Sequence, residues 1–203
     1  LGKGGMAEVF LGRATGEGGF ERLVAVKRIL PDLAETPDFV DMFTDEARIS
    51  AGLSHGNIGQ VYEFGRSDDS YFISMEYIPG VHLRKIYRVF GKMKKIPPPG
   101  LAAYAMANVC AALEHAHTRV DADGAPLNIV HRDISPSNVL VTFEGEIKLI
   151  DFGIARARER VHETSASSLK GKFAYMSPEQ AFGEDLDHRS DVFGAGILLF
   201  ELL

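Results

Sequence analysis

The sequence predicts an α+β protein of two lobes, a small antiparallel sheet with one helix followed by a mainly helical lobe. Short β-branched and apolar runs between turn residues dominate residues 1–78, whereas apolar stripes at helical spacing dominate residues 79–203. Pro79-Gly80 breaks the pattern between them, and we place the lobe boundary there. A chain of 203 residues, 45% hydrophobic and 25% charged, can bury a sizeable core, which excludes a disordered protein.

The first lobe is expected to contain four main strands and one helix. Strands are predicted over residues 8–14 and 23–29 around a glycine-rich turn, and over residues 58–65 and 71–77 around a polar turn. Alternation in the second strand puts Leu23, Ala25 and Lys27 on one face. Thr36 before Pro37 starts an amphipathic helix that Gly52 ends.

The second lobe begins with a helix introduced by residues 97–100. Its apolar stripe consists of Leu101, Tyr104, Ala105, Ala112, Leu113 and Ala116. Two short strands are predicted over residues 139–142 and 147–150, with Glu144-Gly145 as their turn. A polar stretch over residues 156–172 has no periodicity and is expected to be a surface loop, and a final apolar helix covers residues 190–203.

Charge and cysteine content exclude several classes. The net charge of −6 argues against a protein that binds nucleic acid by bulk phosphate neutralisation. The single cysteine, Cys110, cannot form an internal disulfide, and the N-terminus has no signal-peptide pattern. The longest apolar run, residues 192–200, is well short of the ~18 residues that a spanning helix needs. We therefore expect a cytoplasmic chain with no membrane segment of its own, although one could lie beyond it.

Three local features suggest phosphate chemistry, each weakly when taken alone. Residues 1–9 form a glycine-rich turn between strands, which lets backbone N–H groups approach an anion but also suits a plain hairpin. Lys27, on a buried face, needs a carboxylate or phosphate partner. Glu46, on the flank of the helix that packs toward the strands, can supply it, although most helical glutamates are exposed.

The specific signal is a pair of motifs that bracket the predicted hairpin of the second lobe. His131-Arg132-Asp133 is followed by Asn138, and Asp151-Phe152-Gly153 lies 18 residues after Asp133. In this arrangement Asp133 can accept a hydroxyl proton, while Asn138 and Asp151 offer hard oxygen ligands to Mg²⁺.

With these motifs the whole chain resembles the eukaryotic-like (Hanks-type) protein kinase family, in its bacterial Ser/Thr branch. Val24-Ala25-Val26-Lys27, Glu46, the two motifs above and Ser177-Pro178-Glu179 match in the family's order. The resemblance implies Mg-ATP as cofactor and a protein substrate. It also implies that Lys27, positioned by Glu46, holds the α/β-phosphates, that Asp133 is the catalytic base, and that Asn138 and Asp151 bind the metal.

The resemblance further implies an ATP site between the lobes. The phosphates would lie under the loop formed by Leu1, Gly2, Lys3, Gly4, Gly5, Met6 and Ala7, where Ala7 replaces the usual third glycine. Val9, Ala25 and Leu140 would sandwich the adenine, Met75 would lie at the back of the pocket, and the backbone of Glu76 and Ile78 would read the adenine edge.

Arg132 beside the catalytic aspartate resembles the subgroup of kinases controlled by a phosphate on the activation segment. Arg156 occupies the position of a second basic contact. Two guanidinium groups that bind one phosphate can order a loop. We therefore predict autophosphorylation among four hydroxyls, those of Thr164, Ser165, Ser167 and Ser168.

Two departures from the family pattern concern the transferred phosphoryl group. Ser135 stands where Ser/Thr kinases usually carry a lysine, and Lys172 stands where they usually carry a threonine facing the catalytic aspartate. We hypothesise that the two have exchanged roles, since a nearby positive charge stabilises the transition state whichever segment carries it. Pro136 and the Ser-Pro-Glu motif favour Ser/Thr over Tyr as the acceptor.

Other readings stay open. The chain could be a non-catalytic nucleotide-binding scaffold with the kinase fold, although such a scaffold has no chemical need for all five of Lys27, Glu46, Asp133, Asn138 and Asp151. A small-molecule phosphotransferase is disfavoured by the activation segment. By resemblance, the chain starts inside the phosphate loop and stops inside a helix, so we expect a C-terminally truncated kinase fold from a longer protein; a membrane-anchored receptor kinase is one such protein. Whether it dimerises is left open.

Overall fold

The computed structural model describes residues 1–67, 70–152 and 173–203. The predicted surface loop over residues 156–172 therefore lies outside the described residues. The helices and strands are β1 (Gly2–Lys3), β2 (Ala7–Thr15), η1 (Glu17–Gly19), β3 (Glu21–Ile29), α1 (Pro31–Ala34), α2 (Pro37–Ala51), β4 (Val61–Ser67), β5 (Ser70–Glu76), β6 (Gly80–His82), α3 (Leu83–Lys92), α4 (Pro99–His117), β7 (Val139–Thr142), β8 (Ile147–Leu149), η3 (Phe173–Tyr175), α6 (Pro178–Phe182) and α7 (His188–Leu202).

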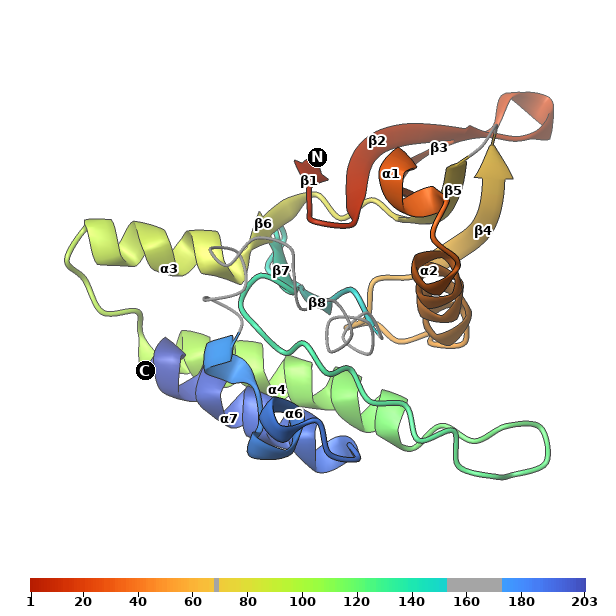
Figure 1. Ribbon diagram of the computed structural model, residues 1–203. Helices are drawn as coiled ribbons and strands as arrows, with labels where there is room; N and C mark the ends of the chain where they lie inside the picture. Colours follow the sequence, from red (N-terminus) through yellow and green to blue (C-terminus); the bar gives the residue numbers. More distant parts are fainter. Residues whose placement is uncertain (68–69, 153–172) are drawn as a thin grey trace.

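The first lobe is an antiparallel sheet, as predicted, but it has five strands in the order β1-β2-β3-β5-β4, since the short β1 adds to the four predicted strands (Figure 1). Helices α1 and α2 pack against it, and its core gathers around Ile29, Phe43 and Ile73. Leu23 does not share the burial of Ala25 and Lys27. It is 48% exposed because it lies near the exposed hairpin end of β3.

Helix α2 begins at Pro37 and ends before Gly52, within the predicted limits. Thr36 occupies the N-cap position, but its side chain makes no capping hydrogen bond. The predicted strand over residues 58–65 was placed too early, since β4 starts at Val61. Ile58 instead forms an isolated parallel bridge with Leu149, and the Gly59 N–H donates to the Leu149 carbonyl over 2.9 Å. This segment thus ties the end of α2 to the second lobe.

The second lobe is built on α4 and α7, which pack against each other (Figure 1). The buried side of α4 is rich in alanine, which lets its neighbours approach closely; it consists of Ala102, Ala105, Met106, Val109, Ala112, Leu113 and Ala116. Tyr104, predicted in the apolar stripe, is exposed, because its hydroxyl reaches out to donate to the Gly145 carbonyl. Part of the apolar side of α7 is exposed, including Val192 and Phe200. Among the described residues, no helix is long and apolar enough to cross a membrane.

The two elements directly after the predicted lobe boundary, β6 and α3, are absent from the sequence prediction. Strand β6 pairs with β7, and β7 with β8, to give a small second sheet. A Cβ atom on Gly80 would lie 2.3 Å from the Val141 carbonyl oxygen, so the close pairing of β6 and β7 requires glycine there. Helix α3 follows directly. The boundary between residues 78 and 79 stays a prediction.

Candidate active site

Lys27 lies where the two lobes meet. It faces inward from β3, as its alternation predicts, and only 8% of it is exposed. Its Nζ atom donates to Glu46 Oε1 on α2 over 2.6 Å and to Asp151 Oδ1 after β8 over 3.0 Å. The predicted contact between Lys27 and Glu46 is therefore present. The ammonium group also joins residues 124 positions apart in the chain.

The buried charges of this cluster shift each other's protonation. Burial favours the neutral form of Lys27, but the charges of Asp151 and Glu46 outweigh it and raise the pKa of the ammonium above its ordinary range. Burial raises the pKa of Glu46 to about 7, against the opposing effect of Lys27. The lysine therefore stays charged at all physiological pH values, while the carboxyl of Glu46 can be protonated near neutrality.

Asp191 of α7 holds the loop that carries Asp133 through hydrogen bonds to the loop's backbone. Asp191 is 1% exposed, and its carboxylate accepts hydrogen bonds from the backbone N–H groups of His131, over 2.7 Å, and Arg132, over 2.8 Å. His117 of α4 contacts the same carboxylate over 2.8 Å. The backbone on the N-terminal side of Asp133 is thus fixed by hydrogen bonds to a buried carboxylate.

The C-terminal side of Asp133 is fixed by Asn138. Its Nδ2 atom donates to the Asp133 carbonyl over 2.7 Å, and its backbone carbonyl accepts from the Ile150 N–H over 3.0 Å. These bonds bring the predicted metal ligands, Asn138 and Asp151, to adjacent backbone segments. Arg132 and Asp151 both adopt positive φ angles, 68° and 64°, which is rare for residues other than glycine. Both residues belong to the two motifs of the predicted site, and backbone strain of this kind clusters at functional sites.

Ser135 is buried without a hydrogen-bond partner for its hydroxyl among the described residues. An unpaired buried hydroxyl costs about 1–3 kcal/mol, so it is unusual in a native structure. The residue lies within the tight turn after Asp133, where its carbonyl accepts from the Asn138 N–H. Lys172, its predicted counterpart, lies outside the described residues.

The residues predicted around ATP lie on both lobes. Val9 faces Lys27 across the β2–β3 pairing, and Ala25 faces Met75 across the β3–β5 pairing, whereas Leu140 lies on β7 of the second sheet. The loop of residues 4–6 closes between β1 and β2, where the Gly4 N–H donates to the Ala7 carbonyl over 2.8 Å.

Part of the segment that was predicted to bind the adenine edge already forms contacts within the protein. The Glu76 N–H donates to the Gln60 carbonyl over 2.7 Å, and its carboxylate pairs with Lys148 over 2.9 Å. Only its backbone carbonyl can therefore serve as predicted, together with the backbone of Ile78.

Of the six predicted regulatory residues, the structure describes one. Arg132 lies in the described loop, and the Gln180 side chain donates to its carbonyl over 2.8 Å. The others lie outside the described residues; they are Arg156, Thr164, Ser165, Ser167 and Ser168.

Two residues that organise the loop escaped the sequence prediction, Asp191 and His117. Asp191 stands at the start of an apolar helix, and a carboxylate in such a helix needs a donor when it is buried. This signal was present in the sequence. Its partners Arg132 and His131 lie 59 and 60 residues earlier in the chain, so no local sequence pattern identifies them.

Comparisons with known proteins identify relatives of this chain in both sequence and structure. Residues 1–203 match the family described as protein kinase domain. The chain is 45% identical over its whole length to tyrosine-protein kinase MasK of Myxococcus xanthus and 38% identical to serine/threonine-protein kinase PrkC of Bacillus subtilis. It spans 31% and 29% of their lengths. The crystal structure of the Mycobacterium tuberculosis PknI kinase domain matches all of this chain, and 71% of that domain, with a TM-score of 0.73 at 28% identity.

Proposed function

Because this chain belongs to the protein kinase family, in its bacterial Hanks-type branch, we propose that it transfers the γ-phosphate of Mg-ATP to Ser/Thr hydroxyls of proteins. The observation that carries the proposal is the placement of Lys27 between Glu46 and Asp151. A cation held between two carboxylates, beside a glycine-rich loop, can exchange part of its contact for phosphate oxygens without moving far.

The donor set fits a magnesium ion bound with nucleotide. Among the described residues, no group of three or more His, Cys, Asp or Glu could hold a metal by itself. Asn138 and Asp151 provide two hard oxygen donors, and Mg²⁺ is commonly bound by one or two protein carboxylates together with substrate phosphates and water. When bound, the ion would neutralise the charge of the phosphates.

In this proposal the protein mainly positions charges. Lys27 orients the α/β-phosphates, and Glu46 keeps the ammonium in place. Asp133 would accept the proton of the substrate hydroxyl as that oxygen attacks the γ-phosphorus, while the bond from the γ-phosphorus to the β,γ-bridging oxygen breaks and ADP leaves. Its carboxylate is aimed by a backbone that Asp191 and Asn138 hold from both sides. Fixed geometry of this kind supplies much of the rate enhancement in phosphoryl transfer.

The unpaired hydroxyl of Ser135 supports the exchanged roles of Ser135 and Lys172. Among the described residues this buried hydroxyl has no hydrogen-bond partner, so no contact commits it to a structural role. In the proposal Ser135 offers that hydroxyl and Lys172 offers the cation. The substitution Lys172→Met tests the idea: a turnover within about threefold of the wild type, under 1 kcal/mol, would contradict it.

The acceptor hydroxyl has a first candidate, Ser/Thr, and a second, Tyr. Relatives named serine/threonine kinases support Ser/Thr, whereas MasK, at 45% identity, is named a tyrosine kinase. Ser135, in place of the lysine of Ser/Thr kinases, is the residue here that favours a tyrosine acceptor as the second candidate. Phosphoamino-acid analysis of the product distinguishes the two.

The proposal also includes autophosphorylation within residues 154–172. Intact-mass measurements of the full-length protein before and after Mg-ATP test the transfer, with Asp133→Asn as control. The mass should rise in steps of one phosphate in the wild type and stay constant in the variant. Bound ATP without added mass, and without transfer to any protein acceptor, would favour the scaffold. Phosphate found only outside residues 154–172 would contradict the predicted regulatory sites.

A further inference from the structure

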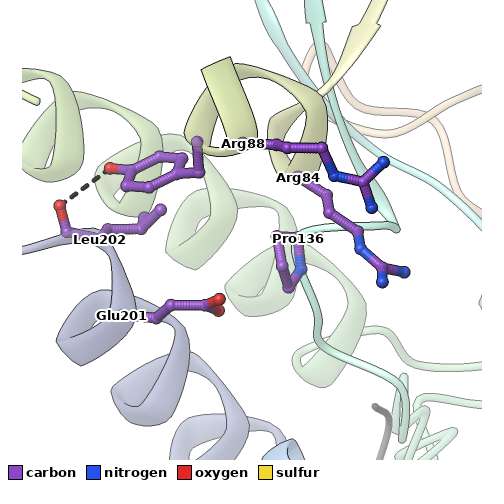
Figure 2. A pocket seen from close by; sticks show the side chains of 6 residues that line it. Arg84, Arg88, Pro136, Glu201 and Leu202 are labelled. Atoms are coloured by element: carbon purple, nitrogen blue, oxygen red, sulfur yellow. Dashed lines mark hydrogen bonds between the residues drawn. The ribbon is translucent and has the colours of Figure 1, made fainter. Parts of the chain in front are cut away.

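We propose that α3 carries a docking subsite for acidic residues of the protein substrate, close to the phosphorylated hydroxyl. The proposal rests on the proposed function, which it deepens by naming the class of substrate. It starts from a cavity of about 360 Å³ between α3 and α7 (Figure 2). Arg84 and Arg88 line it on the α3 side, and Glu201 lines it on the α7 side.

The cavity lies directly beside the candidate active site. The Arg84 N–H donates to the Pro136 carbonyl over 2.9 Å, and Pro136 itself lines the cavity three residues after Asp133. The Tyr87 hydroxyl donates to the Leu202 carbonyl over 2.9 Å and fixes α3 against α7. A peptide whose hydroxyl reaches Asp133 therefore has α3 within reach of its neighbouring residues.

The charge of α3 contrasts with that of the whole chain. Residues 83–95 contain no acidic residue and six of the 22 basic ones, although the chain carries a net charge of −6; they are Arg84, Lys85, Arg88, Lys92, Lys94 and Lys95. Arg84, Arg88 and Lys92 are spaced four residues apart and so share one side of the helix. All three are exposed. Figure 2 shows the guanidinium groups of Arg84 and Arg88 directed the same way beside Pro136.

The cavity is lined by less negative than positive charge. Glu201 is its single acidic lining residue, and its carboxylate already accepts the Tyr175 hydroxyl hydrogen bond. Within the described part of the chain, neither Arg84 nor Arg88 forms an ion pair within 4.0 Å. Guanidinium groups bind carboxylates as forks of two hydrogen bonds. An acidic side chain of the substrate completes this set, whereas a basic one would meet two like charges.

Three peptides with one common Ser acceptor test the inference on the full-length protein. Their flanking residues are Glu, Gln or Lys. The wild type should phosphorylate the Glu peptide with a kcat/KM about tenfold above that of the Gln peptide. In Arg84→Gln/Arg88→Gln this ratio should fall to about twofold or less, because both forks are removed. The matched control, Arg13→Gln/Arg119→Gln, removes two exposed charges elsewhere and should keep the wild-type ratio.

Binding provides a second readout that does not depend on turnover. The affinity of the same peptides with Ala in place of Ser is measured by fluorescence anisotropy, and the preference for Glu should weaken as salt screens the charges. Equal use and binding of the Glu and Gln peptides, or a preference for Lys, would overturn the inference and leave the proposed function intact. If neither a peptide nor any protein acceptor, the protein itself included, is phosphorylated, the proposed function fails, and anisotropy still decides whether α3 selects acidic segments.

Discussion

Two buried charged groups lie on either side of the candidate active site, and they are held by different kinds of partner. Lys27 contacts the carboxylates of Glu46 and Asp151, which belong to side chains. Asp191 contacts two backbone N–H groups of the loop and the ring of His117. Side-chain partners can rotate, titrate and give way to a ligand, whereas backbone donors of a fixed loop cannot. The difference indicates that Lys27 is placed to bind a ligand, whereas Asp191 is placed to support the loop that carries Asp133.

The largest expected effect comes from the supporting side. Asp191→Ala leaves the N–H groups of His131 and Arg132 buried without an acceptor. We expect the free energy of unfolding to fall by about 3–5 kcal/mol, as for removal of one partner of a buried charged network. Chemical denaturation of the full-length protein measures it. A loss within about 0.5 kcal/mol, the range of ordinary surface substitutions, would show that the loop does not depend on this carboxylate.

The next effect concerns the binding side. Lys27→Met should lower phosphoryl transfer by about 10²–10³-fold, the range seen when one preorganised electrostatic donor is removed. Its unfolding free energy should change less than that of Asp191→Ala, because Glu46, whose pKa is already raised to about 7, can take up a proton once its cation is gone. Rates with a protein acceptor, measured beside circular dichroism melts, test both parts. Turnover near the wild-type rate would contradict the assignment of Lys27 to ligand binding.

A pH dependence sharpens the same contrast. In Lys27→Met, burial still raises the pKa of Glu46 and the opposing cation is absent. A carboxyl whose folded pKa is raised stabilises the fold fully below its unfolded pKa, near 4.5, and loses this contribution as pH rises through the folded value. The variant should therefore lose stability as pH rises from about 5, and should lose it relative to the wild type above about pH 7, where Glu46 of the wild type is already ionised. Lys27→Met/Glu46→Gln is the control, and it should show no such trend. Equal slopes in the two variants would exclude Glu46 as the titrating group.

The smallest effect on stability is expected at Ser135. Ser135→Ala removes a buried hydroxyl that has no partner among the described residues, so stability should stay equal or rise by about 1 kcal/mol. If the hydroxyl serves a bound group, phosphoryl transfer should fall at the same time, by about tenfold for one lost hydrogen bond. A loss of stability without a loss of activity would assign the hydroxyl a structural role instead.

Much of the fold was predictable because its strands and helices carry strong periodic patterns. Residues of β2, β3, α2 and α4 were placed within two or three positions of their bounds. Helix α3 was missed although Leu83, Ile86, Tyr87 and Phe90 recur at helical spacing; no capping side chain marks its start. Strand β6 was missed because Gly80 reads as a break, and its role depends on the Val141 backbone 61 residues away.

The candidate site was predictable to the extent that its chemistry lies in compact motifs. The contact of Lys27 with Glu46 follows from a buried lysine that requires a carboxylate. The additional contact with Asp151 and the support from Asp191 depend on how distant segments pack, which no local pattern encodes. The missing partner of Ser135 likewise becomes visible only when burial is known.

The most direct test of the central claim measures Lys27→Met and Asp191→Asn in parallel, each for thermal unfolding and for phosphoryl transfer from Mg-ATP at a temperature where both variants are folded. The account predicts that the two properties separate. Lys27→Met should keep most of its melting temperature and lose transfer, while Asp191→Asn should lose melting temperature and keep measurable transfer. If Lys27→Met unfolds as readily as Asp191→Asn, or transfers phosphate as well as the wild type, the division between a binding side and a supporting side is wrong.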